Sequence, residues 1–153
     1  KDLSMKDYLS EIISSFKEIS QKKFIFNYDQ FSNVKKITKS IEIVYGLRNF
    51  IGNANKFSKE TIYINLKSDS EITEITVEDD GNGYPKDVLS KIGEPYLKSK
   101  DLTDKSKTGL GLGLFIGKTL LEKNLASINC RNSQTRSGAK IVIKWNNKDL
   151  FNI

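Results

Sequence analysis

The sequence contains no histidine and only one cysteine, Cys130, among its 153 residues. The lack of histidine excludes catalysis by a histidine side chain and metal sites built from histidine. A single cysteine excludes an internal disulfide, which fits a protein kept in a reducing compartment. Apolar runs are only a few residues long, so no membrane span is expected. Because the chain starts with Lys1 and shows no signal peptide, we expect a piece cut from a longer protein.

Basic residues outnumber acidic ones by 25 to 19, which gives a net charge of +6. A strongly basic surface would suggest a nucleic-acid or acidic-membrane partner. Here the lysines are scattered, and acidic residues stand directly beside them, as at Lys59 and Glu60. The mixed aromatic and basic patterns of single-strand binders are also absent. We therefore expect no nucleic-acid partner.

The hydrophobic fraction of 37% and the charged fraction of 29% indicate a globular domain, and the length fits one domain over residues 1–153. Apolar residues at three- and four-residue spacing predict helices at about 5–22 and 39–57. Pro85 suits the start of a short helix at about 86–92, and the segment 109–114 opens a helix that runs to about 124. The stripe of the first helix includes Ile19. Alternating patterns predict strands at about 24–28, 61–66, 72–77, 127–131 and 140–145, with the second and third forming a hairpin. This order predicts an α+β fold, a two-layer sandwich with a mixed, mostly antiparallel sheet.

Asn49 and Asn53 lie four residues apart on the second predicted helix and so share one face, which Lys56 extends by a turn. Two carboxamides and an ammonium group on one face could hold a hydrated cation and its phosphates, since Mg²⁺ keeps several waters and needs few protein oxygens. The alternative is an ordinary solvated face.

Asp79, Gly81 and Gly83 directly follow the predicted strand at 72–77. A carboxylate at a strand end can accept a hydrogen bond from an exocyclic amino group. The glycines would let the backbone approach a flat ligand closely. The alternative is a common Asp-Gly turn.

Gly109, Gly111 and Gly113 alternate at the start of the fourth predicted helix and are followed by Leu114. Glycine is costly inside a helix, so three of them need a reason. Backbone N–H groups aimed at phosphate, at the positive end of a helix, supply one. The spacing fits neither a P-loop nor a dinucleotide-binding turn. The alternative is a flexible hinge.

Taken together, the order of these motifs resembles the N, G1, F and G2 boxes of the superfamily that contains histidine kinases, DNA gyrase, MutL and the ninety-kilodalton heat-shock chaperone. The resemblance covers about residues 42–143. Ser137, Gly138 and Ala139 resemble a weaker final glycine box. The polar loop at 94–108 matches the F box and ATP lid, with Tyr96 where phenylalanine is usual. A loop of this length is usually functional.

The histidine-kinase version fits best, and it implies an ATP-binding fold in which Asn53 coordinates Mg²⁺ and Asp79 reads adenine. Asn49 stands where ATP-hydrolysing members carry a glutamate base, and a carboxamide cannot take a proton from water. The resemblance also implies that the glycines cradle phosphates, with Leu114 closing the box. Lys56, Lys98 and Lys100 would offset phosphate charge. Residues around 92–96 and 109–122 look like the RegB/PrrB redox-responsive sensor kinases.

For this chain the resemblance implies a catalytic domain with ATP and Mg²⁺, in the cytoplasm, within a parent protein anchored in the bacterial inner membrane. Residues 1–22 would lead from a dimerisation domain that carries the phosphate-accepting histidine. A response regulator would be an indirect partner. Alternatives are another ATPase of the superfamily, a serine kinase of the anti-sigma type, or a degenerate interaction domain. Cys130 is expected to be a half-buried strand residue, with a redox role as the alternative.

Overall fold

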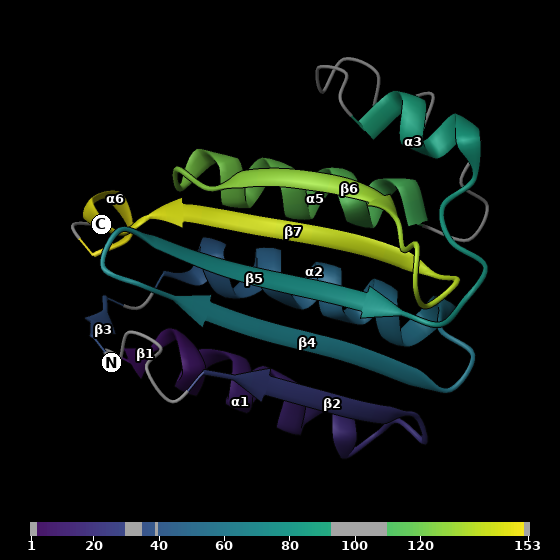
Figure 1. Ribbon diagram of the computed structural model, residues 1–153, viewed down its shortest axis with the longest axis horizontal. Helices are drawn as coiled ribbons and strands as arrows, with labels where there is room; N and C mark the ends of the chain where they lie inside the picture. Colours follow the sequence, from purple (N-terminus) through teal and green to yellow (C-terminus); the bar gives the residue numbers. More distant parts are fainter. Residues whose placement is uncertain (1–2, 30–34, 39, 93–109, 152–153) are drawn as a thin grey trace.

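Five strands form one mixed sheet, and the longest helices lie against one of its faces (Figure 1). The computed structural model describes residues 3–29, 35–38, 40–92 and 110–151. The sheet contains β2 (Lys23–Tyr28), β4 (Thr61–Ser68), β5 (Ile72–Asp79), β6 (Ser127–Asn132) and β7 (Ala139–Asn146). Its strand order is β2-β4-β5-β7-β6, with β2 and β4 parallel and the other pairs antiparallel. The predicted α+β class, the hairpin and the mixed sheet are confirmed.

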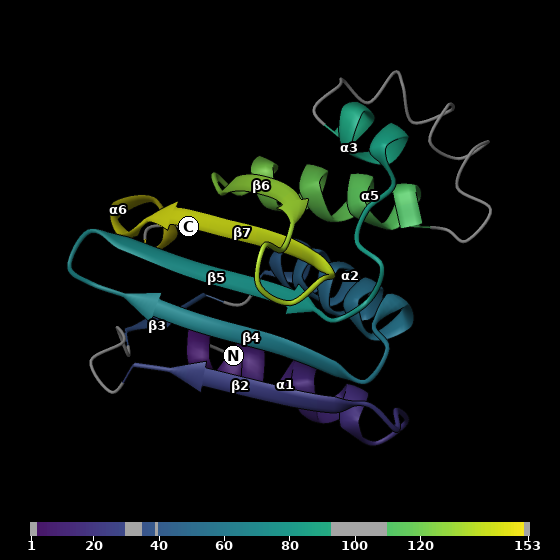
Figure 2. The same cartoon turned by 45° about the vertical axis from the view of Figure 1, so that its right-hand side comes forward.

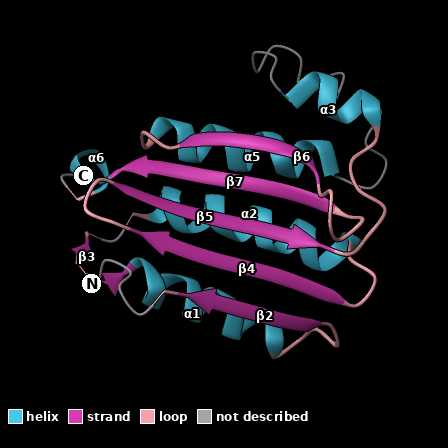
Figure 3. Ribbon diagram, viewed as in Figure 1, coloured by secondary structure: helices cyan, strands magenta, loops and turns pink. Residues whose placement is uncertain are grey.

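The helical layer consists of α1 (Met5–Lys17), α2 (Ile41–Phe57) and α5 (Leu110–Lys123), all on the same side of the sheet (Figure 2). A short helix, α3 (Lys86–Ile92), stands beyond one end of this layer, and α6 (Asn147–Leu150) follows β7 (Figure 3). Two-residue strands β1 (Leu3–Ser4) and β3 (Lys36–Ile37) pair separately. The sequence patterns did not predict β1, β3 or α6. Within the described ranges, no helix combines the length and apolarity needed to cross a bilayer.

Side chains on one face of the central strands build the core together with the helices. Pairing places Ile64 opposite Val77 and Val77 opposite Ile141, and all three are almost fully buried. Since side chains alternate across a strand, Ile75, Val77 and Asp79 point to the same side, toward the helices. The strand therefore ends by placing a carboxylate on its core-facing side.

The first helix is shorter than predicted. It begins at Met5, where Ser4 Oγ accepts a hydrogen bond from Asp7 N, but it ends at Lys17 rather than about residue 22. Ile19, assigned to the apolar stripe, is 81% exposed, so that assignment is wrong. The chain turns away because its next residues bind α2: Ser20 Oγ donates to Asn55 Oδ1 at 2.6 Å, and Lys22 Nζ donates to the carbonyl oxygens of Asn55 and Ser58.

The second helix begins two residues later than predicted and ends where expected. Ser40 caps it, since its Oγ accepts from Ile43 N at 3.2 Å. Ammonium groups stabilise the negative end of a helix, and Lys22 provides one at the C-terminus of α2. This end of α2 carries Asn53 and Phe57, and it lies next to the end of β5.

Candidate functional site

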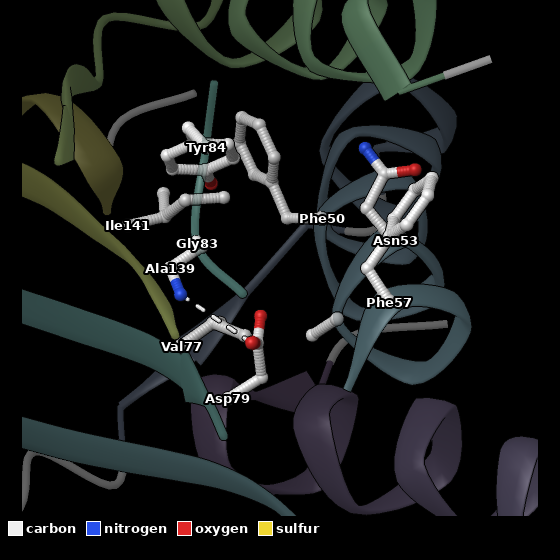
Figure 4. Close-up of a pocket in the computed structure, with 10 residues that line it drawn as sticks. Phe50, Asn53, Phe57, Val77, Asp79, Gly83, Tyr84, Ala139 and Ile141 are labelled. Atoms are coloured by element: carbon white, nitrogen blue, oxygen red, sulfur yellow. Dashed lines mark hydrogen bonds between the residues drawn. The ribbon is translucent and has the colours of Figure 1, made fainter. Parts of the chain in front are cut away.

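A cavity opens between the C-terminal half of α2 and the ends of β5 and β7 (Figure 4). Its polar side chains are Asn53 from α2 and Asp79 from β5. The other described residues of the wall are aromatic, aliphatic or glycine: Phe50, Ala54, Phe57, Val77, Gly83, Tyr84, Ala139 and Ile141. An apolar slot with a few placed polar groups is typical of small-molecule sites.

Asp79 is 4% exposed, and one of its oxygens is fully used within the protein. Its Oδ1 accepts hydrogen bonds from the backbone N–H groups of Gly81 at 2.8 Å and Ala139 at 3.3 Å. The other carboxylate oxygen is directed into the cavity (Figure 4). Burial raises the pKa of Asp79 above its ordinary value of 3.8, although the two backbone hydrogen bonds oppose the shift. The buried carboxylate is thus held in place by one oxygen and left to bind a donor with the other.

The backbone around Asp79 comes very close to it, and this requires glycine. A Cβ at Gly138 would collide with both the carbonyl oxygen and Oδ1 of Asp79. Gly138 precedes β7, and its neighbour Ala139 donates to Asp79. The weak final glycine box is therefore part of the same site, in contact with the carboxylate. Gly81 is buried in the turn after Asp79, against the Phe57 carbonyl.

Asp80 binds the backbone of a loop and does not face the cavity as Asp79 does. Its carboxylate accepts from the backbone N–H groups of Lys59, Glu60 and Thr61, which connect α2 to β4. Burial opposes its ionisation, but these three hydrogen bonds outweigh that effect and lower the pKa of Asp80 below 3.8. Asp80 therefore fixes the loop after α2, while Asp79 faces the cavity.

Asn53 faces both the cavity and the start of α5. Its Nδ2 is buried and has no hydrogen-bond partner among the described residues. A Cβ at Gly113, in the first turn of α5, would lie only 2.8 Å from that nitrogen and 2.9 Å from Oδ1. Glycine at this position therefore lets the helix start approach the carboxamide. A buried polar group without a partner is costly, and a ligand that pairs with it would remove the cost.

The other predicted site residues lie as follows. Asn49 does not line the cavity; its Nδ2 donates to the carbonyl oxygen of Tyr45 at 2.8 Å, four residues back along α2. The Lys56 ammonium lies 5.3 Å from the ring centroid of Phe57, which does line the cavity. Gly111 is buried in the first turn of α5, and Leu114 is fully buried in the core rather than at the cavity. Tyr96, Lys98, Lys100 and Gly109 lie outside the described residues.

Several wall residues were not predicted from the sequence, because no short sequence pattern identifies them as part of a site. Phe50 and Phe57 belong to the apolar side of α2, while Ile141 is one of the alternating apolar residues of β7. Their role depends on the register that sets β7 beside β5. Tyr84 was the one available signal, as a large aromatic residue directly after the two glycines.

The fit of Mg²⁺ can be judged from the donor set. Among the described residues there is no cluster of three or more histidine, cysteine, aspartate or glutamate side chains. Mg²⁺ is commonly held by one or two protein oxygens together with phosphates and waters. If the side-chain carboxamide of Asn53 flipped, its Oδ1 atom would take the position that Nδ2 now occupies. Asn53, beside the start of α5, therefore fits a cation that arrives with a nucleotide.

Cys130 lies on β6 with its side chain half-buried. Burial raises the pKa of its thiol to about 12, so the reactive thiolate is scarce. This favours the expected strand residue over a redox role.

Known proteins resemble this chain in sequence and in fold. Residues 38–149 match the family described as histidine kinase-, DNA gyrase B-, and HSP90-like ATPase. The sensor histidine kinase RegB of Cereibacter sphaeroides is 35% identical over 124 residues, covering 71% of this chain and 27% of that protein. The sensor histidine kinase CpxA of Escherichia coli is 29% identical over 97 residues, covering 63% and 21%. The chain thus spans about a quarter of the length of these relatives.

Solved structures show the same fold. The catalytic domain of histidine kinase ThkA superposes with a TM-score of 0.75 at 20% identity, covering 95% of this chain and 94% of that one. The mycobacterial sensor histidine kinase MprB gives 0.72 at 19% identity, covering 95% and 96%. The predicted two-layer architecture is therefore confirmed.

Proposed function

Because this chain belongs to the family of histidine kinase-, DNA gyrase B-, and HSP90-like ATPases, we propose that it is the ATP-binding catalytic domain of a sensor histidine kinase. In this role it transfers the γ-phosphoryl group of ATP to a histidine on a dimerisation domain of the parent protein. The observation that supports the proposal is that Asp79 and Asn53 line one cavity, with the start of α5 lying against the Asn53 carboxamide.

The base of ATP lies between the α2 side and the sheet side of the cavity, where the walls are apolar. Its exocyclic amino group donates to the Asp79 oxygen that is not bound to the backbone (Figure 4). Apolar faces on both sides exclude water, and this strengthens the hydrogen bond. Asp79 thereby selects a base that offers a donor at this position.

The triphosphate extends from the base toward Asn53 and the first turn of α5. Backbone N–H groups at a helix N-terminus favour negative charge, and Gly113 allows Asn53 to lie against that turn. Asn53 holds the Mg²⁺ that accompanies the phosphates, and Lys56, Lys98 and Lys100 offset their charge. The bound ion neutralises charge that develops during transfer, so positioning supplies most of the catalysis.

Transfer, rather than rapid hydrolysis, is the expected reaction. By the resemblance, Asn49 corresponds to the glutamate base of the hydrolysing members, and a carboxamide cannot accept a proton from water. The chain has no histidine, so the acceptor comes from another domain, and a response regulator receives the phosphoryl group afterwards. We place the domain in the cytoplasm, with its parent protein anchored in the inner membrane.

The test uses the purified chain, radiolabelled ATP and Mg²⁺, with and without the histidine-bearing dimerisation domain of the parent. Acid-labile phosphate should appear only on the added domain. Acid-labile phosphate on this chain alone would contradict the proposal. Brisk release of inorganic phosphate without the added domain would instead favour an ATPase of the same superfamily.

A further inference from the structure

Tyr84 stands inside the cavity and leaves little room there. Its side chain is only 6% exposed, and with Phe50 it occupies the end opposite Asp79 (Figure 4). The volume left is about 20 Å³, which holds about one water molecule. A purine base is several times larger than a water molecule, so at least one wall must shift before a base can enter.

Most of the walls are fixed by regular structure. Phe50 is fully buried in the middle of α2, and a Cβ at Gly117 of α5 would lie 2.9 Å from its ring. Val77 and Ile141 are directly paired neighbours in central strands. Tyr84 lies in the stretch between β5 and α3, where the backbone is neither helix nor strand. Among Phe50, Val77, Ile141 and Tyr84, only Tyr84 lies outside a helix or strand, so its ring is the least constrained by packing within regular structure.

The backbone beneath the ring is nevertheless held. Asn132, at the end of β6, accepts from Tyr84 N at 2.6 Å through Oδ1 and donates to Tyr84 O at 3.3 Å through Nδ2. Gly83 has a φ of +79°, and a Cβ there would lie 2.7 Å from Asn132 Oδ1. The Asn132 side chain therefore binds both the N–H group and the carbonyl oxygen of Tyr84, as a neighbouring strand would, and holds this backbone in place. Movement is limited to rotation of the Tyr84 side chain about its own bonds.

We propose that the Tyr84 ring controls access of the nucleotide base to the cavity, closing it in the free protein and rotating aside when the base binds. This inference rests on the proposed function. Asn132 is the positioning residue, because it keeps the Tyr84 backbone in place while the ring moves. Burial, with smaller contributions from Cys130 and Asp79, raises the pKa of the phenol well above 10, so the ring stays neutral.

The closed state reduces the apparent association rate by the fraction of molecules that are open. Minor states are commonly populated at about 0.1–10%, so removal of the ring should raise the rate by about 10- to 1,000-fold. Tyr84→Ala should therefore bind faster, and Tyr84→Leu should fall between it and the native protein. Tyr84→Phe should match the native rate, because it retains the ring. A merely structural role would lower affinity without accelerating association.

The experiment is stopped-flow binding of ATP that carries a fluorescent group on its ribose, with Mg²⁺. Val88→Ala is the matched control, since Val88 is buried in the neighbouring α3 but does not line the cavity, and its rate should stay unchanged. Fluorescence of Trp145, the single tryptophan, checks folding of each variant.

The possible outcomes separate the two ideas. If the native chain binds and the folded Tyr84→Ala and Tyr84→Leu variants associate no faster, Tyr84 does not control access, while the proposed function stands. If only the shortened variants bind, the Tyr84 ring blocks the cavity permanently, so both controlled access and ATP binding by the native chain are overturned. If no folded variant binds, the proposed function and this inference are both overturned.

Discussion

Replacement of Asp79 by asparagine separates binding of the base from stability of the fold. Both backbone hydrogen bonds to Asp79 end on Oδ1, and the amide oxygen of asparagine can accept them equally well. The amide nitrogen then takes the place of the oxygen that faces the cavity. Two donors, this nitrogen and the amino group of the base, would point at each other.

The magnitude follows from the loss of one hydrogen bond to a buried charged group, which contributes about 1.5–3 kcal/mol. This corresponds to a fall in ATP affinity of about 10- to 150-fold, measured by titration calorimetry with Mg²⁺ present. The free energy of unfolding in urea, followed by Trp145 fluorescence, should not fall below that of the native chain.

Asp80→Asn is the matched control, because it makes the same chemical change one residue along the chain. There, both carboxylate oxygens accept backbone N–H groups of the loop after α2. An amide nitrogen must face one of these donors, so stability should fall by about 1 kcal/mol while ATP affinity is retained. Unchanged ATP affinity in a folded Asp79→Asn variant would refute the assignment of the base to this carboxylate.

Three further predictions concern the same site. Gly113→Ala should weaken ATP binding by at least about tenfold, because its Cβ would displace the Asn53 carboxamide. Gly52→Ala, on the α1 side of α2 where the new Cβ would meet the Phe16 ring at 3.4 Å, should bind ATP normally by calorimetry. Asn53→Ala should abolish phosphoryl transfer. Without nucleotide its free energy of unfolding should stay the same or rise slightly, since the change removes a buried amide nitrogen that has no partner among the described residues. A decrease in the free energy of unfolding of more than about 2 kcal/mol would contradict this. The raised pKa of Asp79 means that the folded chain keeps this proton to a higher pH than the unfolded chain. Its contribution to stability is therefore present at low pH and lost as the pH rises from 3.8 through the raised pKa. Urea unfolding across this range should show Asp79→Asn gaining stability relative to the native chain as the pH rises, and a constant difference would disprove it.

The sequence predicted the elements that have strong local signals. Alternation along β5 located the strand, and the same alternation accounts for the inward direction of Asp79. The apolar stripes of α1 and α2 located the helix starts to within two residues. These features depend on neighbours a few residues apart, which a sequence displays directly.

Contacts between distant segments could not be predicted in this way. Gly138 meets Asp79 and Asn132 meets Tyr84 only because β7 and β6 continue the sheet beyond β5. The early end of α1 depends on Lys22 reaching α2, which is 33 or more residues away in sequence. The parallel pairing of β2 with β4 likewise has no local signal, since it depends on α2 crossing between them.

The attachment of Lys22 to α2 also sets the smallest chain that could retain the site. The family match begins at residue 38, but β2, which precedes it, pairs with β4 along its whole length. A protein shortened to the matched segment would expose the edge of β4 and leave the helix carrying Asn53 without α1 or the Lys22 ammonium at its end. The segment around residues 5–28 therefore belongs to the same folded unit as the cavity, because it pairs with β4 and binds the end of α2 that carries Asn53.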